Sequence, residues 1–512
     1  MKKIKWVLLF LILSLAFLLG ARMILAGDFF YLFDQARDYL LTQSIVQTHS
    51  LALIGTHSGL GGFFHGPLWL YMLAPVYILG KGNPFTFTYF YIGLQLFTIF
   101  IAYLVGRRLY GNKGGLLISL LIALSPVTWG SVPNTIGVNV EPLVFLGLFY
   151  FLIKFIRGEK NAFIFAAFFA GLSLQFETAL PLVLMPMMVI SFFLNRQAIK
   201  DLRLTVLCLI AYILSVSSFI LFDLRHKFLM TSAVISAFTA HGPKGKDYLK
   251  LSDRIPAHIN SLWGVYKSLL FNENILLSLF FVAILLFGII LFIKTKQKYK
   301  KEFFFLLLFP ILTYALFMGY AYPIYGPYVL GLLIPVALSF YLAMCEAWKN
   351  AFGKVLVIIF FAFTFLAVSS SLQNQYLKTY PRSDSAGSYL NQKAVVEWIY
   401  ENAGSGVFGY FVYSTSTYTH GPDYLISWYH KSHPTILFES KKDVITYLIL
   451  APHMTGDNGA YDFWKKNVLH IGNEDKVLLT KTFAGGIIVE KLEIGNKEPP
   501  VDPNYYQGLL FR

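Results

Sequence analysis

The feature that most constrains this chain is a series of long apolar runs separated by short basic segments. A helix that crosses a bilayer needs about 20 mostly apolar residues. With 56% hydrophobic and 13% charged residues, the chain also has too few polar side chains to coat a soluble globule. We therefore predict a mainly α-helical, polytopic membrane protein. About eleven spans are expected, near residues 4–26, 85–106, 114–130, 141–156, 161–176, 179–194, 204–222, 275–293, 303–320, 326–343 and 354–373.

The distribution of Lys and Arg predicts the orientation of these spans. The apolar segment 66–80 is short for a span, so we place it in the membrane interface. Every short basic loop then lies on one side, which the positive-inside rule assigns to the cytoplasm. These loops contain Arg107/Arg108/Lys113, Lys154/Arg157/Lys160, Arg196/Lys200/Arg203, Lys294/Lys296/Lys298/Lys300/Lys301 and Lys349/Lys354. We predict a multi-pass plasma-membrane protein with a cytoplasmic N-terminus and an extracytoplasmic C-terminus.

The spans divide the chain into a transmembrane domain, 1–373, and a terminal extracytoplasmic domain, 374–512. Two further extracytoplasmic loops are expected at 27–84 and 223–274. Helical and strand-like patterns alternate in the terminal domain, which predicts a small α/β fold. Helices are expected at 392–402, 424–430 and 461–468, and strands at 407–413, 435–438, 446–451, 476–483 and 486–493.

Reactive residue types collect on the predicted extracytoplasmic side. In FDQARDYL, residues 33–40, the spacing places Asp34, Arg37 and Asp38 on one face of a helix. A carboxylate there can accept a proton from a hydroxyl nucleophile, and a guanidinium can hold a phosphate. The alternative is that Asp34 only caps a helix over 35–47.

Other ionisable residues lie at the predicted ends of spans or of the first loop. A charged group is costly at such a place, which makes each one a candidate for function, although some could simply be solvated. His65 precedes a Gly-Pro turn and could bind a phosphate or a metal. The remaining candidates are Asp28, His49, His57, Glu141, Glu177, Asp223, Arg225, His226 and Lys227.

Two motifs in this order resemble the GT-C superfamily of integral membrane glycosyltransferases, and most closely its protein O-mannosyltransferase and lipid A aminoarabinose transferase branch. The first is Asp34-Gln35-Ala36-Arg37-Asp38-Tyr39, after the first span, and the second is His65-Gly66-Pro67-Leu68, at the end of the same loop. Gln35 stands where the family usually has an acidic residue, and Gly66 stands in place of a first proline. Weaker matches lie around Glu141, Glu177, Asp223–His226 and Tyr325–Pro335.

This resemblance implies a polyprenyl-phosphate-linked sugar donor and transfer with inversion to a protein, lipid or glycan acceptor at the extracytoplasmic face. It implies Asp34 as the general base and Glu141 as a residue that orients the acceptor or the sugar. Arg37, Arg225, His226 and Lys227 would meet the phosphate, and Asp38, His65, Glu177 and Asp223 would also contact substrate. The sequence assigns no cofactor. A divalent metal could bind through His65 with Glu141 or Asp34, although that ligand set is incomplete.

Several other functions receive less support from the sequence. The chain has no GxxxxGK[ST] loop for nucleotide-driven transport, and no basic stripe with stacking aromatics for nucleic acid. A secondary transporter or flippase of lipid-linked glycans is the main alternative, but it predicts symmetric halves and charges at mid-span. A membrane anchor for the terminal domain would not need about eleven spans.

Overall fold

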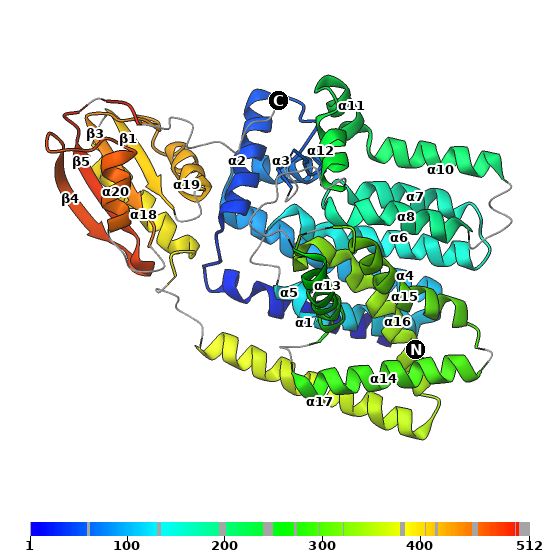
Figure 1. The fold of residues 1–512 in the computed structure, drawn as a ribbon. Helices are drawn as coiled ribbons and strands as arrows, with labels where there is room; N and C mark the ends of the chain where they lie inside the picture. Colours follow the sequence, from blue (N-terminus) through cyan, green and yellow to red (C-terminus); the bar gives the residue numbers. More distant parts are fainter. Residues whose placement is uncertain are drawn as a thin grey trace.

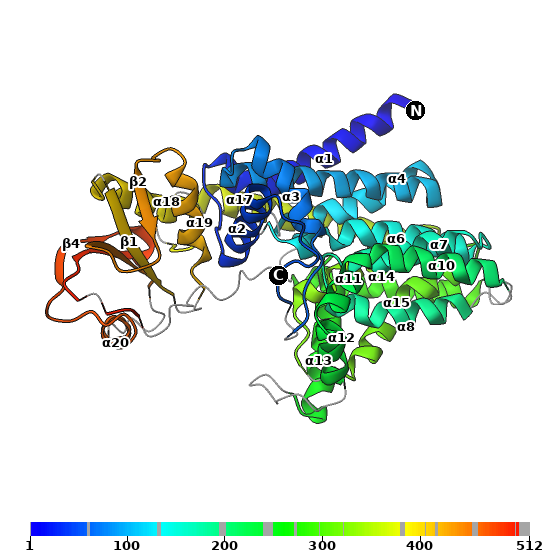
Figure 2. The same cartoon turned by 90° about the horizontal axis from the view of Figure 1, so that it is seen from above.

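The computed structural model describes all residues except 1, 59–61, 131–134, 194–200, 239–248, 271–273, 296, 321, 379–384, 405, 415–417, 453–458, 497 and 501–512. A large helical bundle and a smaller unit built on a sheet lie side by side (Figure 1). In the orthogonal view the sheet lies beyond one end of the bundle, and α19 (His420–His430) lies between the sheet and α2 (Phe33–Thr48) (Figure 2). The predicted fold class is confirmed by this arrangement.

The helical part contains long apolar helices and several short connecting helices. In chain order they are α1 (Lys2–Leu25), α2 (Phe33–Thr48), α3 (Leu68–Leu79), α4 (Pro84–Leu124), α5 (Pro126–Gly130), η1 (Gly137–Val140), α6 (Glu141–Ile156), α7 (Ala162–Ser173), α8 (Ala179–Phe193), α10 (Leu202–Ser215), α11 (Ser217–Arg225), α12 (Leu229–Phe238), α13 (Leu251–Lys267), α14 (Ile275–Lys294), α15 (Lys300–Phe317), η2 (Gly326–Leu332), α16 (Leu333–Ala347) and α17 (Ala351–Lys378).

The positions of the helices match the predicted apolar stretches, but the described helices that are long enough to cross a membrane are fewer than the predicted spans. In the described part of the chain, 6 helices are long and apolar enough to cross a membrane, or 7 if α10 and α11, bent by 66°, form one span. Each predicted stretch nevertheless lies mainly in a helix. The number of crossings and the orientation of the termini stay predictions.

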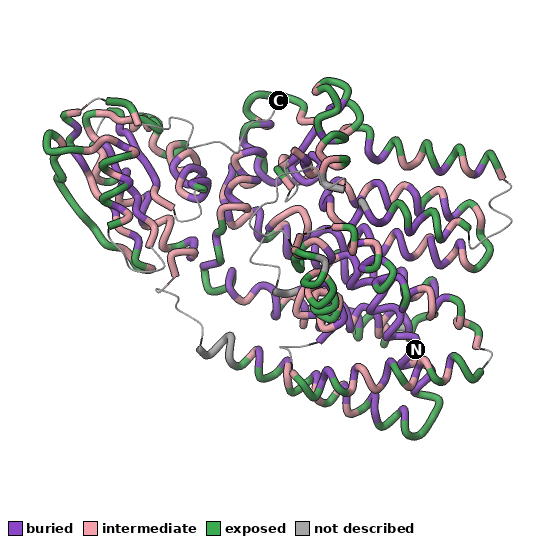
Figure 3. The backbone as a smooth tube through the Cα atoms, in the orientation of Figure 1, coloured by how far each residue is buried: buried purple, intermediate pink, exposed green. Residues whose placement is uncertain are grey.

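The outer helices expose apolar side chains in a way that suits lipid. Leu209 of α10 is 54% exposed, Leu279 of α14 is 60% exposed and Phe365 of α17 is 70% exposed. Their outward faces appear in green beside the buried inner faces in Figure 3. Because large contiguous apolar patches are rare on soluble monomers, these faces indicate contact with a bilayer.

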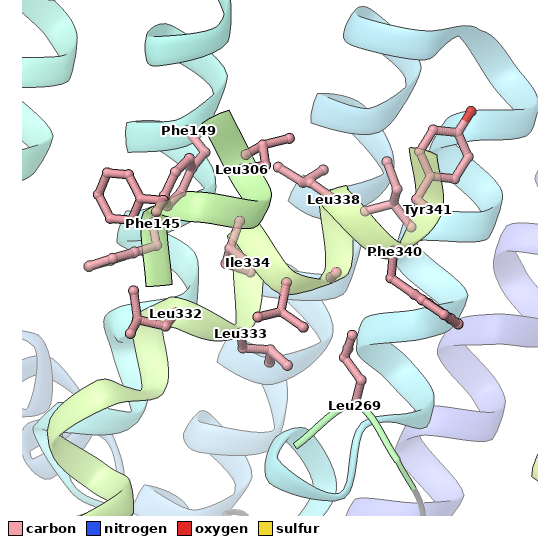
Figure 4. Packing of buried hydrophobic residues seen from close by; sticks show 14 of the residues in the cluster. Phe145, Phe149, Leu269, Leu306, Leu332, Leu333, Ile334, Leu338, Phe340 and Tyr341 are labelled. Atoms are coloured by element: carbon pink, nitrogen blue, oxygen red, sulfur yellow. The ribbon is translucent and has the colours of Figure 1, made fainter. Parts of the chain in front are cut away.

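The core of the bundle forms around α16, whose side chains are buried almost along its whole length. Ile334 and Leu338 of α16 pack with Phe145 and Phe149 of α6 and Leu306 of α15 (Figure 4). Such close packing restricts helix movement because protein interiors have few voids. The bundle therefore offers a rigid support for the segments at its ends.

A helical hairpin within α4 depends on glycine. Gly111 has φ of 80°, a left-handed conformation that interrupts the helix between the predicted spans 85–106 and 114–130. The two halves then fold against each other. A Cβ atom added at Gly115 would lie 2.6 Å from the carbonyl oxygen of Tyr103.

We predict that Gly115→Ala lowers the stability of the bundle by about 1–3 kcal/mol, because backbone would have to move. Gly93 is the matched control, since a Cβ at this exposed position of the same helix meets nothing within 4 Å. Thermal unfolding in detergent should show a lower Tm for Gly115→Ala and an unchanged or higher Tm for Gly93→Ala. Equal Tm values for both variants would contradict close packing at Gly115.

The terminal unit is the predicted α/β fold. Its sheet has the order β2-β1-β3-β5-β4, with β1 parallel to β2 and β3, and β5 antiparallel to β3 and β4. The first two helices of this unit begin three and four residues earlier than predicted, at Tyr389 and His420, and the third begins two residues earlier, at Gly459. The elements are α18 (Tyr389–Asn402), β1 (Gly406–Tyr413), α19 (His420–His430), β2 (Ile436–Glu439), β3 (Ile445–Leu450), α20 (Gly459–Asn467), β4 (Lys476–Thr482), η3 (Ala484–Gly486) and β5 (Ile488–Glu493).

One apolar core extends from this sheet into the helical part. It includes Tyr447 of β3 and Tyr424 of α19, together with Tyr39 of α2, Trp69 of α3 and Phe87 of α4. The proposed domain boundary at residue 373 is thus crossed by continuous packing. As a result, α2 lies between the terminal unit and the bundle.

Candidate active site

The acidic motif occupies the first two turns of α2. The helix begins at Phe33, and its N-cap is Leu32, so Asp34 is a helical residue. The interpretation of Asp34 as the cap of a helix that starts at Gln35 is therefore wrong. The cap contact comes from Gln35, whose Oε1 accepts a hydrogen bond from the Leu32 N–H at 2.9 Å. This contact gives the unexpected glutamine a structural role at the helix start.

Arg37 joins the two aspartates on the predicted face. Its Nη1 donates to Asp34 Oδ1 at 2.6 Å, and its Nε and Nη2 donate to Asp38 Oδ1 at 3.1 and 3.0 Å. Trp69 Nε1 donates to the other oxygen of Asp38 at 2.9 Å. Asp38 is 2% exposed, whereas the Asp34 side chain is 36% exposed. Asp38 is therefore held by its neighbours, and Asp34 remains accessible.

Burial raises the pKa of Asp38 to about 6, although Arg37 and Trp69 favour the charged form. The guanidinium and the indole compensate in part for the loss of water around this carboxylate. Without them the buried charge would be strongly unfavourable. Arg37 is consequently fixed in place by an interaction that the fold itself requires.

The α2 face lines a cavity of about 280 Å³. Residues from five other segments complete the lining, so the cavity exists only in the folded chain. The predicted residues that line it are Asp34, Arg37, Asp38, His65 and Glu177. The lining also includes His57, which the sequence places among the extracytoplasmic candidates, and Thr56, Trp69, Gln175 and Tyr328, which the sequence did not single out.

Nearby motif residues offered some indication of these additional positions. Trp69 directly follows His65-Gly66-Pro67-Leu68, and Gln175 is two residues before Glu177. Tyr328 belongs to the Tyr-rich segment that starts at Tyr325. None of these residue types is distinctive by itself, because buried aromatic and amide side chains are common in any core.

His65 lies where two segments of the same loop, residues 55–58 and 63–65, are joined by backbone hydrogen bonds. The backbone N–H of His65 donates to the Thr56 carbonyl at 2.8 Å, and the backbone carbonyl of His65 accepts from the Gly55 N–H at 2.7 Å. Burial, and to a smaller extent Arg37, lower the pKa of His65 to about 3. The imidazole is therefore neutral at physiological pH, and it can act as a hydrogen-bonding group but not as a cation.

The glycine after His65 is explained by close packing. A Cβ atom at Gly66 would lie 2.7 Å from the Cα of Gln175 and closer still to its side chain. Gln175 is itself fixed, since its Nε2 donates to the Ser215 carbonyl at 3.0 Å. Because proline also carries a Cβ, the first proline of the family motif would not fit here without a backbone shift.

Glu177 faces the same cavity from the connection between α7 and α8. Its Oε1 accepts hydrogen bonds from the N–H groups of Thr178 and Ala179 at 2.7 and 3.0 Å, at the start of α8. Burial raises the pKa of Glu177 to about 7, against these two donors. A carboxyl group with such a pKa can exchange a proton near neutral pH.

Glu141 lies at the start of α6 and is fully buried. It does not line the 280 Å³ cavity, but it lies close enough to Glu177 for their charges to interact. In the described part of the chain, neither of its carboxylate oxygens has a hydrogen-bond partner. A buried polar group without a partner indicates a site of function or of a bound molecule.

The predicted cluster at the end of α11 lies outside the cavity lining. Asp223 caps α12, accepting from the Met230 N–H at 2.8 Å and from the Thr231 N–H at 3.0 Å. Arg225 and Lys227 are exposed, and His226 is half-buried. Substrate contact by these four residues stays a prediction.

The residues present fit a metal ion poorly. Among the described residues, no group of three or more His, Cys, Asp or Glu side chains lies together in a way that could hold one. Asp34 and Asp38 already face the guanidinium of Arg37.

A second cavity of about 640 Å³ adjoins the first. Ile136 and Pro327 line both. The larger cavity is bounded by η2 and α13, and its lining is mostly apolar, with a few amide and hydroxyl groups. The site therefore combines a small charged compartment with a larger apolar one.

Comparison with known proteins gives a consistent fold. No protein-family profile and no curated protein sequence matches the chain. Two crystal structures of ArnT from Cupriavidus metallidurans, one apo and one bound to undecaprenyl phosphate, are similar over nearly the whole chain. The apo form has a TM-score of 0.59 at 11% identity, covering 96% of this chain and 98% of its own. The bound form has a TM-score of 0.58 at 10% identity, covering 97% and 99%.

The archaeal oligosaccharyltransferase AglB from Archaeoglobus fulgidus, in complex with an inhibitory peptide and a dolichol-phosphate, is also similar. Its TM-score is 0.50 at 10% identity, and the match covers 99% of this chain and 77% of that one. The chain therefore has the fold of the GT-C integral membrane glycosyltransferases, as the two sequence motifs implied.

We predict that Glu177 makes stability depend on pH. Its ordinary pKa of 4.5 applies to the unfolded chain, so the folded state binds the proton more tightly. The contribution to stability is complete below the unfolded value and is lost as pH rises through about 7. The Tm of the wild type should therefore fall relative to that of Glu177→Gln between about pH 5 and about pH 8.

The matched control for this titration is Glu474→Gln, at an exposed position of the terminal unit. This variant should follow the wild type at every pH. A difference in Tm between wild type and Glu177→Gln that stays constant with pH would show that Glu177 does not titrate in this range.

Proposed function

We propose that this protein transfers a sugar from a polyprenyl-phosphate-linked donor to an acceptor hydroxyl at the extracytoplasmic face of a membrane, with inversion at the sugar carbon. The observation that carries the proposal is the acid–arginine–acid face of α2 beside a small cavity that adjoins a larger apolar one. The GT-C fold supports it, as do neighbours that bind undecaprenyl phosphate or dolichol-phosphate.

The two cavities suit the two parts of such a donor. A polyprenyl chain is apolar and would enter the cavity beside η2 and α13 from the lipid. The phosphate and the sugar would lie in the smaller cavity, next to Arg37. Clefts that combine apolar walls with a few polar groups are typical of ligand sites.

Asp34 is the proposed general base. It is the more exposed of the two α2 aspartates, and it faces the cavity. As the acceptor oxygen attacks the sugar carbon, its proton passes to Asp34 while the bond from that carbon to the phosphate oxygen breaks. Polyprenyl phosphate leaves with the electron pair of the broken bond, and Asp34 then loses its proton to solvent.

Arg37 is the proposed partner of the leaving phosphate. Three of the five N–H donors of its guanidinium are used by Asp34 and Asp38. The remaining donors can stabilise the negative charge that develops on the phosphate. His65, which is neutral, and Glu177 would orient the sugar or the acceptor. Glu141, whose charge interacts with that of Glu177, would help to orient the same groups.

We predict that Asp34→Asn lowers donor turnover by about 10²–10⁴-fold, because the amide cannot accept the proton. The measurement is the release of polyprenyl phosphate by protein in nanodiscs, with a panel of polyprenyl-phosphate hexoses and pentoses and added acceptor alcohols. Asp462→Asn, in α20 of the terminal unit, is the matched control and should keep wild-type turnover.

Equal release by the wild type and Asp34→Asn would remove Asp34 from the reaction and leave Glu177 or Glu141 as the next candidate base. Transport can be measured with the same protein reconstituted into lipid vesicles. Movement of intact donor across the vesicle membrane, with no release of polyprenyl phosphate, would favour the flippase alternative over a transferase.

A further inference from the structure

The terminal unit is attached to the segment between α1 and α2 by a buried carboxylate. Asp28 is 5% exposed and precedes α2 by a few residues. Its Oδ2 accepts from Ser388 Oγ at 2.7 Å, and its Oδ1 accepts from the Leu390 N–H at 3.2 Å. Ser388 is the N-cap of α18, so Asp28 completes the cap of a helix that belongs to the terminal unit. A negative charge is favourable at this end of a helix.

Backbone contacts reinforce the same junction. The Tyr31 N–H donates to the Gly387 carbonyl at 2.8 Å, and the Tyr389 N–H donates to the Phe29 carbonyl at 3.0 Å. The rings of Phe29 and Tyr389 stack with their centroids 4.8 Å apart. The chain is thus fixed directly before the first turn of α2.

Helix α19 then follows α2 along its length. The Tyr418 ring, just before α19, stacks on Phe33 at 4.8 Å, and the Tyr424 ring contacts that of Tyr39 at 5.3 Å. Further along, Gln43 Nε2 donates to Ser427 Oγ at 2.7 Å. Both ends of α2 therefore contact the terminal unit.

Helix α19 and the residue that follows it also contact α3 and the turn between α3 and α4. The Tyr424 hydroxyl donates to the Gly82 carbonyl at 2.6 Å, and Lys431 Nζ donates to the Tyr77 hydroxyl at 2.6 Å. The Lys431 ammonium lies 4.3 Å from the centroid of the Tyr77 ring. Since Trp69 at the start of α3 binds Asp38, α19 supports both helices that hold this carboxylate.

We propose that Asp28 is a positioning residue of the candidate site, and that the terminal unit, held by Asp28 and α19, sets the direction in which α2 presents Asp34 and Arg37. The expected effect of Asp28 on turnover rests on the proposed transfer, whereas its expected effect on the position of α2 does not. A displacement of about 1 Å at a catalytic group can lower a rate about a hundredfold. The terminal unit thereby becomes part of the catalytic apparatus without touching the reacting atoms.

The test uses Asp28→Ala in the full chain, in nanodiscs. Loss of the cap should speed hydrogen exchange of the α2 amides by about five- to tenfold. It should also lower kcat about ten- to a hundredfold, with little change in the donor KM. Asp28→Asn, which keeps an oxygen acceptor for the Leu390 N–H, should restore most of both properties.

Asp475→Ala is the matched control. Asp475 is the residue before β4 and accepts three backbone N–H donors, from Gly472, Gly495 and Asn496. β4 is the edge strand on the side of the sheet away from α2 (Figure 1). This variant should change neither α2 exchange nor turnover. Ser427→Ala tests the α19 contact by a smaller change if Asp28→Ala does not fold, and it should also speed exchange in α2.

Wild-type α2 exchange and wild-type kcat in Asp28→Ala would overturn the proposal, as would equal losses in Asp475→Ala. If the wild type releases no polyprenyl phosphate from any donor, the proposed transfer fails. Hydrogen exchange in α2 then decides the positioning role by itself.

Discussion

The burial of Asp38 is the constraint on which the rest of the candidate site depends. A carboxylate at 2% exposure requires charge and hydrogen-bond donors close by, and Arg37 and Trp69 supply them. Because Arg37 must stay beside Asp38, its remaining donors point to a defined place, and Asp34 is drawn to the same guanidinium. One structural interaction thereby leaves an accessible carboxylate and a fixed cation at the wall of a cavity.

The cavity lies where the regular helices of the bundle end. Its walls come from η1, from the connection between α7 and α8, from η2 and from the loop before α3. Non-helical backbone at the edge of a membrane protein is tolerated where it lines a cavity or packs against protein. The rigid core around α16 packs against these segments, and the terminal unit packs against α2. The proposed transfer depends on both supports, because polar groups stabilise a transition state only if they are already in place.

The sequence predicted the helices well because their apolar runs are long and the period of the pattern is clear. It also predicted the shared face of Asp34, Arg37 and Asp38, which follows from helical spacing alone. The alternative in which Asp34 caps a helix from Gln35 fails because the helix starts at Phe33 and its cap contact comes from Gln35, a residue that does not usually mark a helix start. The roles of Trp69 and Gln175 were not predictable, since each depends on a contact with a residue far away in the chain.

The amino-acid sequence was enough to predict a helical membrane protein, an α/β terminal unit and the two motifs of the first loop, because hydrophobic length, periodicity and local spacing are properties of neighbouring residues. The folded chain was needed to show that Glu177 joins these motifs while Asp223 caps a helix, that two cavities adjoin, and that Asp28 binds the terminal unit. Those features arise from packing between segments up to 362 residues apart. No local pattern records such contacts, because their energy comes from shape and burial in the assembled fold.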